Sequence, residues 1–175
     1  EALRIWPDAH YVLFEAMDSV EFLYKERGIR DYHIGVLSDQ SGKTVEFWQN
    51  DYHPGGNSYY KENIDINPSV PEYFNEKHRR VYVAKTLAQV VAERGFPLPD
   101  LVKMDVQGAE MDIVRGAEDI IKHAQHVILE LQKIEYNTGA PLHQEVIDYM
   151  YNLGFDCAGV FSDNGPDGDY HFIRR

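Results

Sequence analysis

The sequence contains one cysteine, Cys157, among its 175 residues. A disulfide framework and a zinc site made of several thiolates both need more cysteines, so neither can form within this chain. Proteins that do without disulfides are typical of reducing compartments. We therefore expect an intracellular, cytoplasmic protein.

Long apolar runs and an excess of basic residues are missing as well. No stretch comes near the ~20 consecutive apolar residues of a membrane-spanning helix. The 17 Lys and Arg residues are outnumbered by 29 Asp and Glu, which gives a formal net charge of -12. A field of that sign repels the phosphates of nucleic acids and of anionic membranes. We expect neither as a partner, and an uncharged or cationic small molecule as the better substrate.

What is present is the composition of a globular protein, with 43% apolar and 13% aromatic residues. A chain of this length forms one domain that buries roughly 70% of the surface its unfolded form exposes. Strand and helix patterns alternate along it, which favours an α/β fold with ligands at the carboxyl ends of the strands. Expected strands cover residues 10–14, 32–37, 44–49, 81–83, 101–104, 126–130, 155–161 and 170–173. Expected helices end at Gly28, Gly95 and Gly154, and a further one follows Gly108.

Residues 101–130 are the most informative stretch. The first strand ends at Asp105, and Gly108 allows the sharp turn that must follow. Apolar residues then recur at the spacing of one helical face, at Ile113, Val114, Ala117, Ile120 and Ile121. A second buried strand ends at Glu130. With the usual right-handed crossover, the two carboxylates share one rim of the sheet.

Other strand ends carry groups suited to a nucleoside. Glu15 stands where such sheets bind two ribose hydroxyls, with a solvated loop acid as the alternative. Ser38 or Asp39, after the next strand, can accept a hydrogen bond from the amine of adenine. An Asx turn that only caps the strand explains Asp39 at least as well. Glu110 either belongs to the site or only complements the dipole of the helix that it starts.

An insertion at about residues 50–80 is not placed by the sequence. Residues 50–57 read NDYHPGGN, and no helix follows the two glycines. A lid over a bound substrate is therefore a better functional interpretation of this loop than a phosphate cradle. Residues 63–80 show weak periodicity, apart from a short helix expected at residues 72–77.

Three motifs of the central stretch, KMDVQGAE (residues 103–110), VRGAED (114–119) and VILE (127–130), resemble the signature of the FkbM-type S-adenosylmethionine-dependent methyltransferases. FEA (14–16), LSDQSG (37–42) and VAKTLAQVV (83–91) are similar to further parts of it. The resemblance implies a Rossmann-like class I methyltransferase sheet, mostly parallel with an antiparallel last strand. It also implies a single methyltransferase domain over residues 1–175 that methylates a hydroxyl of a sugar or small metabolite, so that the acceptor is a small molecule or a glycan.

The chain departs from the family pattern in two places. The family's first strand and its glycine-rich DxGANxG turn, which hold the methionine end of the cofactor, are absent from this chain. We therefore expect a domain that lacks its N-terminal strand and has a gap in the middle of its sheet. Gln107 stands where the family usually has Glu, which removes one acid from the rim.

The resemblance also assigns residues to the site. S-adenosylmethionine is expected to contact Glu15, Ala16, Ser38, Asp39, Asp105 and Gln107. Asp105 and Glu130 are the expected catalytic residues, either as ligands of a divalent metal ion or with one of them as general base. His143 is a further catalytic candidate in the loop behind Glu130, with an exposed histidine at a helix start as the alternative.

Other classes of function remain open. A nucleotide-binding oxidoreductase domain shares the alternating plan, but its GxGxxG turn and a hydride-site pair such as Tyr and Lys are not readable here. A non-catalytic binding module is the other alternative, favoured by the absent glycine turn if the natural protein begins at Glu1. The acceptor, the need for a metal ion and the oligomeric state do not follow from the sequence.

Overall fold

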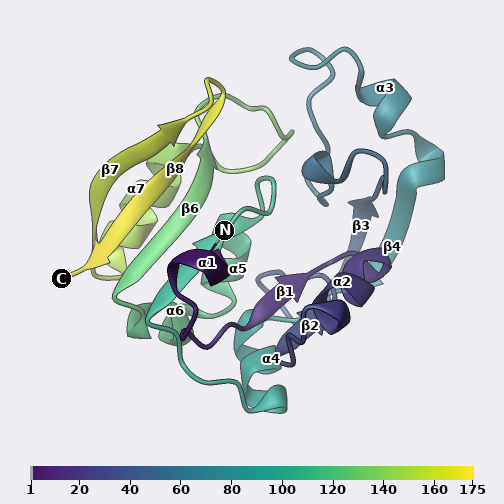
Figure 1. Cartoon of the computed structure of the whole chain (residues 1–175). Helices are drawn as coiled ribbons and strands as arrows, with labels where there is room; N and C mark the ends of the chain where they lie inside the picture. Colours follow the sequence, from purple (N-terminus) through teal and green to yellow (C-terminus); the bar gives the residue numbers. More distant parts are fainter. Residues whose placement is uncertain (1) are drawn as a thin grey trace.

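The structure is a computed structural model that describes residues 2–175, a mixed α/β fold with three small sheets (Figure 1). The strands are β1 (Leu13–Glu15), β2 (Tyr32–Ile34), β3 (Thr44–Trp48), β4 (Arg79–Val83), β5 (Leu101–Met104), β6 (His126–Gln132), β7 (Phe155–Asp163) and β8 (Asp167–Arg174). The helices are α1 (Ala2–Ile5), α2 (Glu21–Glu26), α3 (Val70–Tyr73), α4 (Leu87–Arg94), α5 (Glu110–Arg115), α6 (Glu118–His123) and α7 (His143–Asn152). Within the described residues, no helix has both the length and the apolar character that crossing a membrane requires.

The largest sheet has the strand order β5–β6–β8–β7. β5 and β6 run parallel, and β8 is antiparallel to both β6 and β7. The βαβ unit and the antiparallel last strand are therefore confirmed. A single, mostly parallel sheet is not observed, because β1 and β2 form a separate parallel pair and β3 and β4 an antiparallel one. In the part of the chain that is described, no strand joins β1 to β5, which leaves the sheets apart.

One face of the large sheet is covered by helices, and α7 passes behind β6 and β8 in Figure 1. The side chains of β6 and β8 alternate, so that every second one is buried against these helices. This core contains Val114, Ile121, Val127, Leu129, Val146, Met150 and Phe172. It fixes the position of β5 and β6, and with them the acids at their carboxyl ends.

The helix predicted after Gly108 is wrong in extent, because it is interrupted between α5 and α6. A Cβ atom on Gly116 would lie 2.5 Å from the carbonyl oxygen of Ser38, so the chain passes this segment too closely for a side chain. Ala117 leaves the helical conformation there, with φ -154° and ψ 36°. The predicted apolar residues still face the core, with Ile113, Val114, Ala117 and Ile121 buried.

Other boundaries differ less. The strand expected over residues 10–14 is confined to Leu13–Glu15, because β2 offers only three residues to pair with it. α4 begins and ends as expected: the Thr86 hydroxyl accepts a hydrogen bond from the Gln89 N–H at 3.1 Å, and Gly95 ends the helix with φ 66°.

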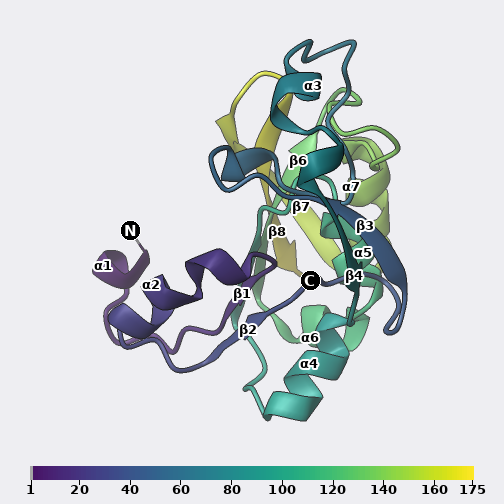
Figure 2. The same cartoon turned by 90° about the vertical axis from the view of Figure 1, so that its right-hand side faces the viewer.

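The insertion lies beyond β3 and β4, beside the loop that follows β6 (Figures 1 and 2). Buried polar groups hold it there. The Asn137 amide donates a hydrogen bond to the Tyr60 carbonyl at 2.7 Å, and Glu62 Oε2 accepts one from the Tyr136 hydroxyl at 3.4 Å. The helix expected at residues 72–77 is wrong in position: α3 lies earlier, and a 3-10 turn, Glu76–His78, follows it.

Candidate active site

The carboxyl ends of β5 and β6 bring two acids together. Met104 is paired with Leu129, so the residues that follow, Asp105 and Glu130, lie side by side. The side-chain amide of Gln107 joins them: its Nε2 lies 3.0 Å from Asp105 Oδ1 and 2.9 Å from Glu130 Oε2. The shared rim is confirmed, and the catalytic roles of the two acids stay predictions.

The turn between β5 and α5 is held from inside the protein. Glu110 is buried, and its Oε1 accepts a hydrogen bond from the Val106 N–H at 2.8 Å. Burial raises the pKa of Glu110 to about 7, although hydrogen bonds from backbone N–H groups oppose the shift. Gly108 has φ 95° and passes so close to Ala140 that a Cβ would lie 2.6 Å from the Ala140 Cβ. Glu110 therefore stabilises the turn between β5 and α5 from the protein interior.

Gly108→Ala is expected to lower the free energy of unfolding by about 2–6 kcal/mol. The new methyl group both disfavours the positive φ and overlaps Ala140, and each effect costs about 1–3 kcal/mol. Urea unfolding measures the change. Gly139→Ala is the matched control, because Gly139 also has a positive φ, 79°, but a Cβ there meets nothing within 4 Å. Equal losses in the two variants would contradict the close approach to Ala140.

Glu130 is half-buried, and its pKa is raised to about 8. Burial is the largest cause, followed by the neighbouring Asp105, through a shared hydrogen bond and through its charge. Lys103 opposes the shift, but its Nζ lies 2.6 Å from Asp169 and 3.8 Å from Asp105. A carboxyl group that titrates near neutral pH is suited to take a proton from a substrate.

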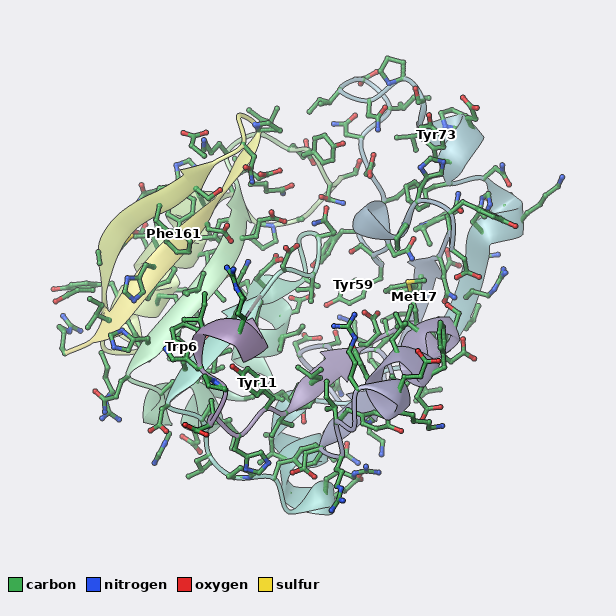
Figure 3. The ribbon with its side chains drawn as sticks, in the orientation of Figure 1. Trp6, Tyr11, Met17, Tyr59, Tyr73 and Phe161 are labelled. Carbon is green, nitrogen blue, oxygen red and sulfur yellow. The ribbon has the colours of Figure 1, made fainter. Side chains whose placement is uncertain are left out.

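A cavity of about 420 Å³ lies beside this rim, a size typical of small-molecule sites. Glu15, at the end of β1, and Asp105, after β5, both line it. Met17 and Tyr59 are further lining residues, and Figure 3 shows them close together near the middle of the molecule. The cavity therefore lies between the carboxyl ends of strands from two different sheets.

The predicted cofactor residues divide into two groups. Glu15, Ala16, Asp105 and Gln107 line the cavity. Ser38 and Asp39 are not among the lining residues: Ser38 is fully buried, and Asp39 Oδ1 accepts a hydrogen bond from Lys43 Nζ at 2.8 Å. The ion pair with Lys43 lowers the pKa of Asp39. The geometry of Asp39 is that of a local turn, and its contact with adenine stays a prediction.

His143 does not line the cavity either. It is the first residue of α7, and its ring stacks on Tyr170 with 5.7 Å between the centroids. Its Nδ1 is buried without a hydrogen-bond partner among the described residues. His143 therefore packs against Tyr170 of β8, and its catalytic role stays a prediction.

Metal ligation was the other expectation for Asp105 and Glu130. Over residues 2–175, no group of three or more His, Cys, Asp or Glu side chains is arranged to hold a metal ion. The Gln107 amide instead lies within hydrogen-bonding distance of both carboxylates.

The sequence did not identify the residues that form the far wall of the cavity. Pro54, Gly55, Asn57, Ser58 and Tyr59 come from the insertion, and Val36, Leu37 and Phe47 come from the segments around β2 and β3. The only signal for them was the glycine-rich loop interpreted as a lid. The structure places part of that loop at the cavity wall.

A buried carboxylate on α5 links this wall of the cavity to the β5–α5 segment. Asp112, on α5, accepts hydrogen bonds from the hydroxyls of Tyr59 and Tyr60 at 3.1 and 3.0 Å. Burial, followed by the charge of Asp112, raises the pKa of both tyrosines. Both hydroxyls therefore remain protonated donors. The insertion and the β5–α5 turn are parts of one structural unit around the cavity.

Residues 6–157 match the family model of the methyltransferase FkbM domain. The chain belongs to this family. The FkbM domain includes β1 to α7, and thus every residue that lines the cavity. This match confirms the resemblance that the sequence motifs indicate. Membership of the family implies an enzyme that uses S-adenosylmethionine to methylate an acceptor. No curated protein and no solved structure matches the chain.

Proposed function

We propose that this FkbM domain transfers a methyl group from S-adenosylmethionine to a hydroxyl of a sugar or another small metabolite. The observation that carries the proposal is the rim formed by Asp105, Gln107 and Glu130, two of which also line the cavity. We infer that a nucleoside site and a proton-accepting carboxyl adjoin each other here, because Gln107 lines the cavity and its amide contacts Glu130, which lies outside the lining. The net charge of -12 supports an acceptor that is not a polyanion such as nucleic acid.

The cavity suits the adenosine part of the cofactor. Glu15 supplies a carboxylate at the end of β1, the position from which such sheets bind both ribose hydroxyls. Its Oε1 accepts a hydrogen bond from the Met17 N–H at 2.9 Å, which fixes the side chain at the cavity. Met17, Val36 and Phe47 give the cavity apolar walls for a base.

We further infer a Rossmann-like plan from the order of the strands. The pair β2–β1 and the sheet β5–β6–β8–β7 follow one another in that plan, with β1 and β5 on either side of the position of the family's first strand. The parallel pairs β1–β2 and β5–β6 then belong to one mostly parallel sheet with an antiparallel last strand. Glu15 and Asp105 support this plan, because they line the same cavity from β1 and β5.

Methyl transfer to a hydroxyl places two requirements on the protein. S-adenosylmethionine, when bound, supplies a methyl group on a sulfonium, which is transferred by in-line displacement. The protein must align the acceptor hydroxyl and accept its proton. Glu130 accepts the proton, because its raised pKa makes its carboxylate a base of suitable strength. Asp105 orients the hydroxyl from the other side of the rim, and Gln107 holds both carboxylates.

Calorimetric titration of the full-length protein with S-adenosylhomocysteine tests the cofactor. We expect micromolar binding and a loss of about 10–100-fold in Glu15→Ala. The variant lacks a charged acceptor for the ribose, and hydrogen bonds to charged groups contribute about 1.5–3 kcal/mol each.

Glu72→Ala is the matched control for this titration, because Glu72 is an exposed glutamate that does not line the cavity. It should bind as the unaltered protein does. If the unaltered protein does not bind S-adenosylhomocysteine, the proposed reaction is rejected. If it binds and Glu15→Ala binds equally well, the cofactor does not lie in this cavity.

A further inference from the structure

Gln107 has an unusual backbone. Within residues 2–175 it is the one residue other than glycine with a positive φ, 54°. The left-handed conformation costs energy in any residue with a Cβ atom, and such strain persists only where the surroundings impose it. The strained residue is also one that lines the cavity, which is where stored strain has a functional meaning.

The surroundings of Gln107 impose this conformation from both sides. The Val106 N–H before it is held by the buried Glu110 carboxyl at 2.8 Å. Gly108 after it is pressed against Ala140. These two contacts hold the backbone on either side of Gln107, and its side-chain amide lies between Asp105 and Glu130.

The side-chain NH2 group of Gln107 has two N–H bonds, and it lies within hydrogen-bonding distance of both carboxylates. When both acids are deprotonated, their oxygens only accept hydrogen bonds, so the nitrogen of the amide then faces them. One nitrogen atom lies 3.0 Å from Asp105 Oδ1 and 2.9 Å from Glu130 Oε2. Two neighbouring acids need a donor or a cation between them, and here a neutral donor fills that place. The Lys103 ammonium also lies near the pair, with its Nζ 3.8 Å from Asp105 Oδ2, but its shorter contact, 2.6 Å, is with Asp169.

We propose that the Gln107 amide takes the place of a divalent cation between Asp105 and Glu130, so that the rim holds its acceptor hydroxyl without a metal ion. This role rests on the proposed function in one respect, the acceptor hydroxyl. Gln107 is then a positioning residue that acts through the two carboxylates. The left-handed backbone is the conformation that lets one side chain reach both.

Gln107→Glu provides the test, with Mn²⁺ as the probe. The substitution replaces the donor with a third carboxylate that points at the other two, and clustered carboxylate oxygens are the ligands that hard divalent cations prefer. We expect calorimetric titration to show that the variant binds Mn²⁺ at least tenfold more tightly than the unaltered protein. Adding Glu130→Gln to the variant should remove the gain.

Gln144→Glu is the matched control. Gln144 is exposed, and its amide lies 2.9 Å from one carboxylate, that of Asp148, so the substitution adds the same charge beside a single acid. No gain in Mn²⁺ affinity is expected from it. The thermal midpoint of Gln107→Glu, measured beside that of the unaltered protein, checks that the variant is folded.

Two results would overturn the proposal. One is Mn²⁺ binding by the unaltered protein that Glu130→Gln abolishes, since the rim would then already be a metal site. The other is a folded Gln107→Glu variant without a gain in Mn²⁺ affinity, since the three side chains would not converge. Neither depends on cofactor binding, so failure of the S-adenosylhomocysteine titration is distinguishable from failure here.

Discussion

Glu130→Gln is expected to lower kcat for methyl transfer to a hydroxyl acceptor by about 10²–10⁴-fold, the usual contribution of a positioned general base. Glutamine keeps the shape of the side chain but cannot take the proton of the hydroxyl. The fall should therefore appear in kcat, with little change in the affinity for S-adenosylhomocysteine. Glu26→Gln, at an exposed position on α2, is the control for the substitution itself.

The pH dependence of the same reaction gives an independent check. Glu130 must be deprotonated to act as a base, and its pKa in the protein is about 8. The rate should therefore increase as the pH rises through about 8 and level off above it, and it should fall at lower pH. The residual activity of Glu130→Gln should lack this step. An unaltered profile in that variant would show that another group accepts the proton.

The rim could be predicted from sequence because its cause is local and periodic. Two short apolar runs with a helix between them predict a parallel pair, and the register of such a pair places Asp105 and Glu130 at neighbouring ends. The connection by Gln107 could not be predicted in this way. It depends on a left-handed backbone that Glu110 and Ala140 impose, and no residue pattern indicates these contacts.

The far wall of the cavity was unpredictable for a different reason. Tyr59 and Tyr60 reach Asp112, which is 53 and 52 residues away in the chain, through side-chain hydrogen bonds. The insertion around them has no periodic pattern, since buried polar contacts rather than an apolar face hold it in place. The break between α5 and α6 was missed likewise, because it depends on the close passage of Gly116 by Ser38.

Glu110 is the second position where a large effect is expected, here on stability. In the folded protein its pKa is about 7, against an ordinary value of 4.5. Between these two pH values the unfolded chain has released the proton and the folded protein still binds it. The folded state is therefore favoured at low pH, and the advantage is lost as the pH rises through about 7. For a fully buried group, the loss is on the order of 3 kcal/mol.

Glu110→Gln removes this titration but keeps an oxygen that accepts the hydrogen bond from the Val106 N–H. At pH 5 the variant and the unaltered protein should unfold at similar urea concentrations, since both carry a neutral side chain. At pH 8 the variant should be the more stable one by about 3 kcal/mol, because the unaltered protein must then bury a charge. The measurement is the free energy of unfolding at both pH values.

Glu110→Ala separates the charge of this side chain from its hydrogen bond. Relative to Glu110→Gln, it leaves the Val106 N–H without the side-chain oxygen that accepts its hydrogen bond, which costs about 1–3 kcal/mol at either pH. Equal pH dependence in Glu110→Gln and the unaltered protein would mean that Glu110 does not titrate between pH 5 and 8. If Glu110→Ala is as stable as Glu110→Gln at both pH values, the hydrogen bond from the Val106 N–H is dispensable for the turn, and the close packing of Gly108 on Ala140 holds it.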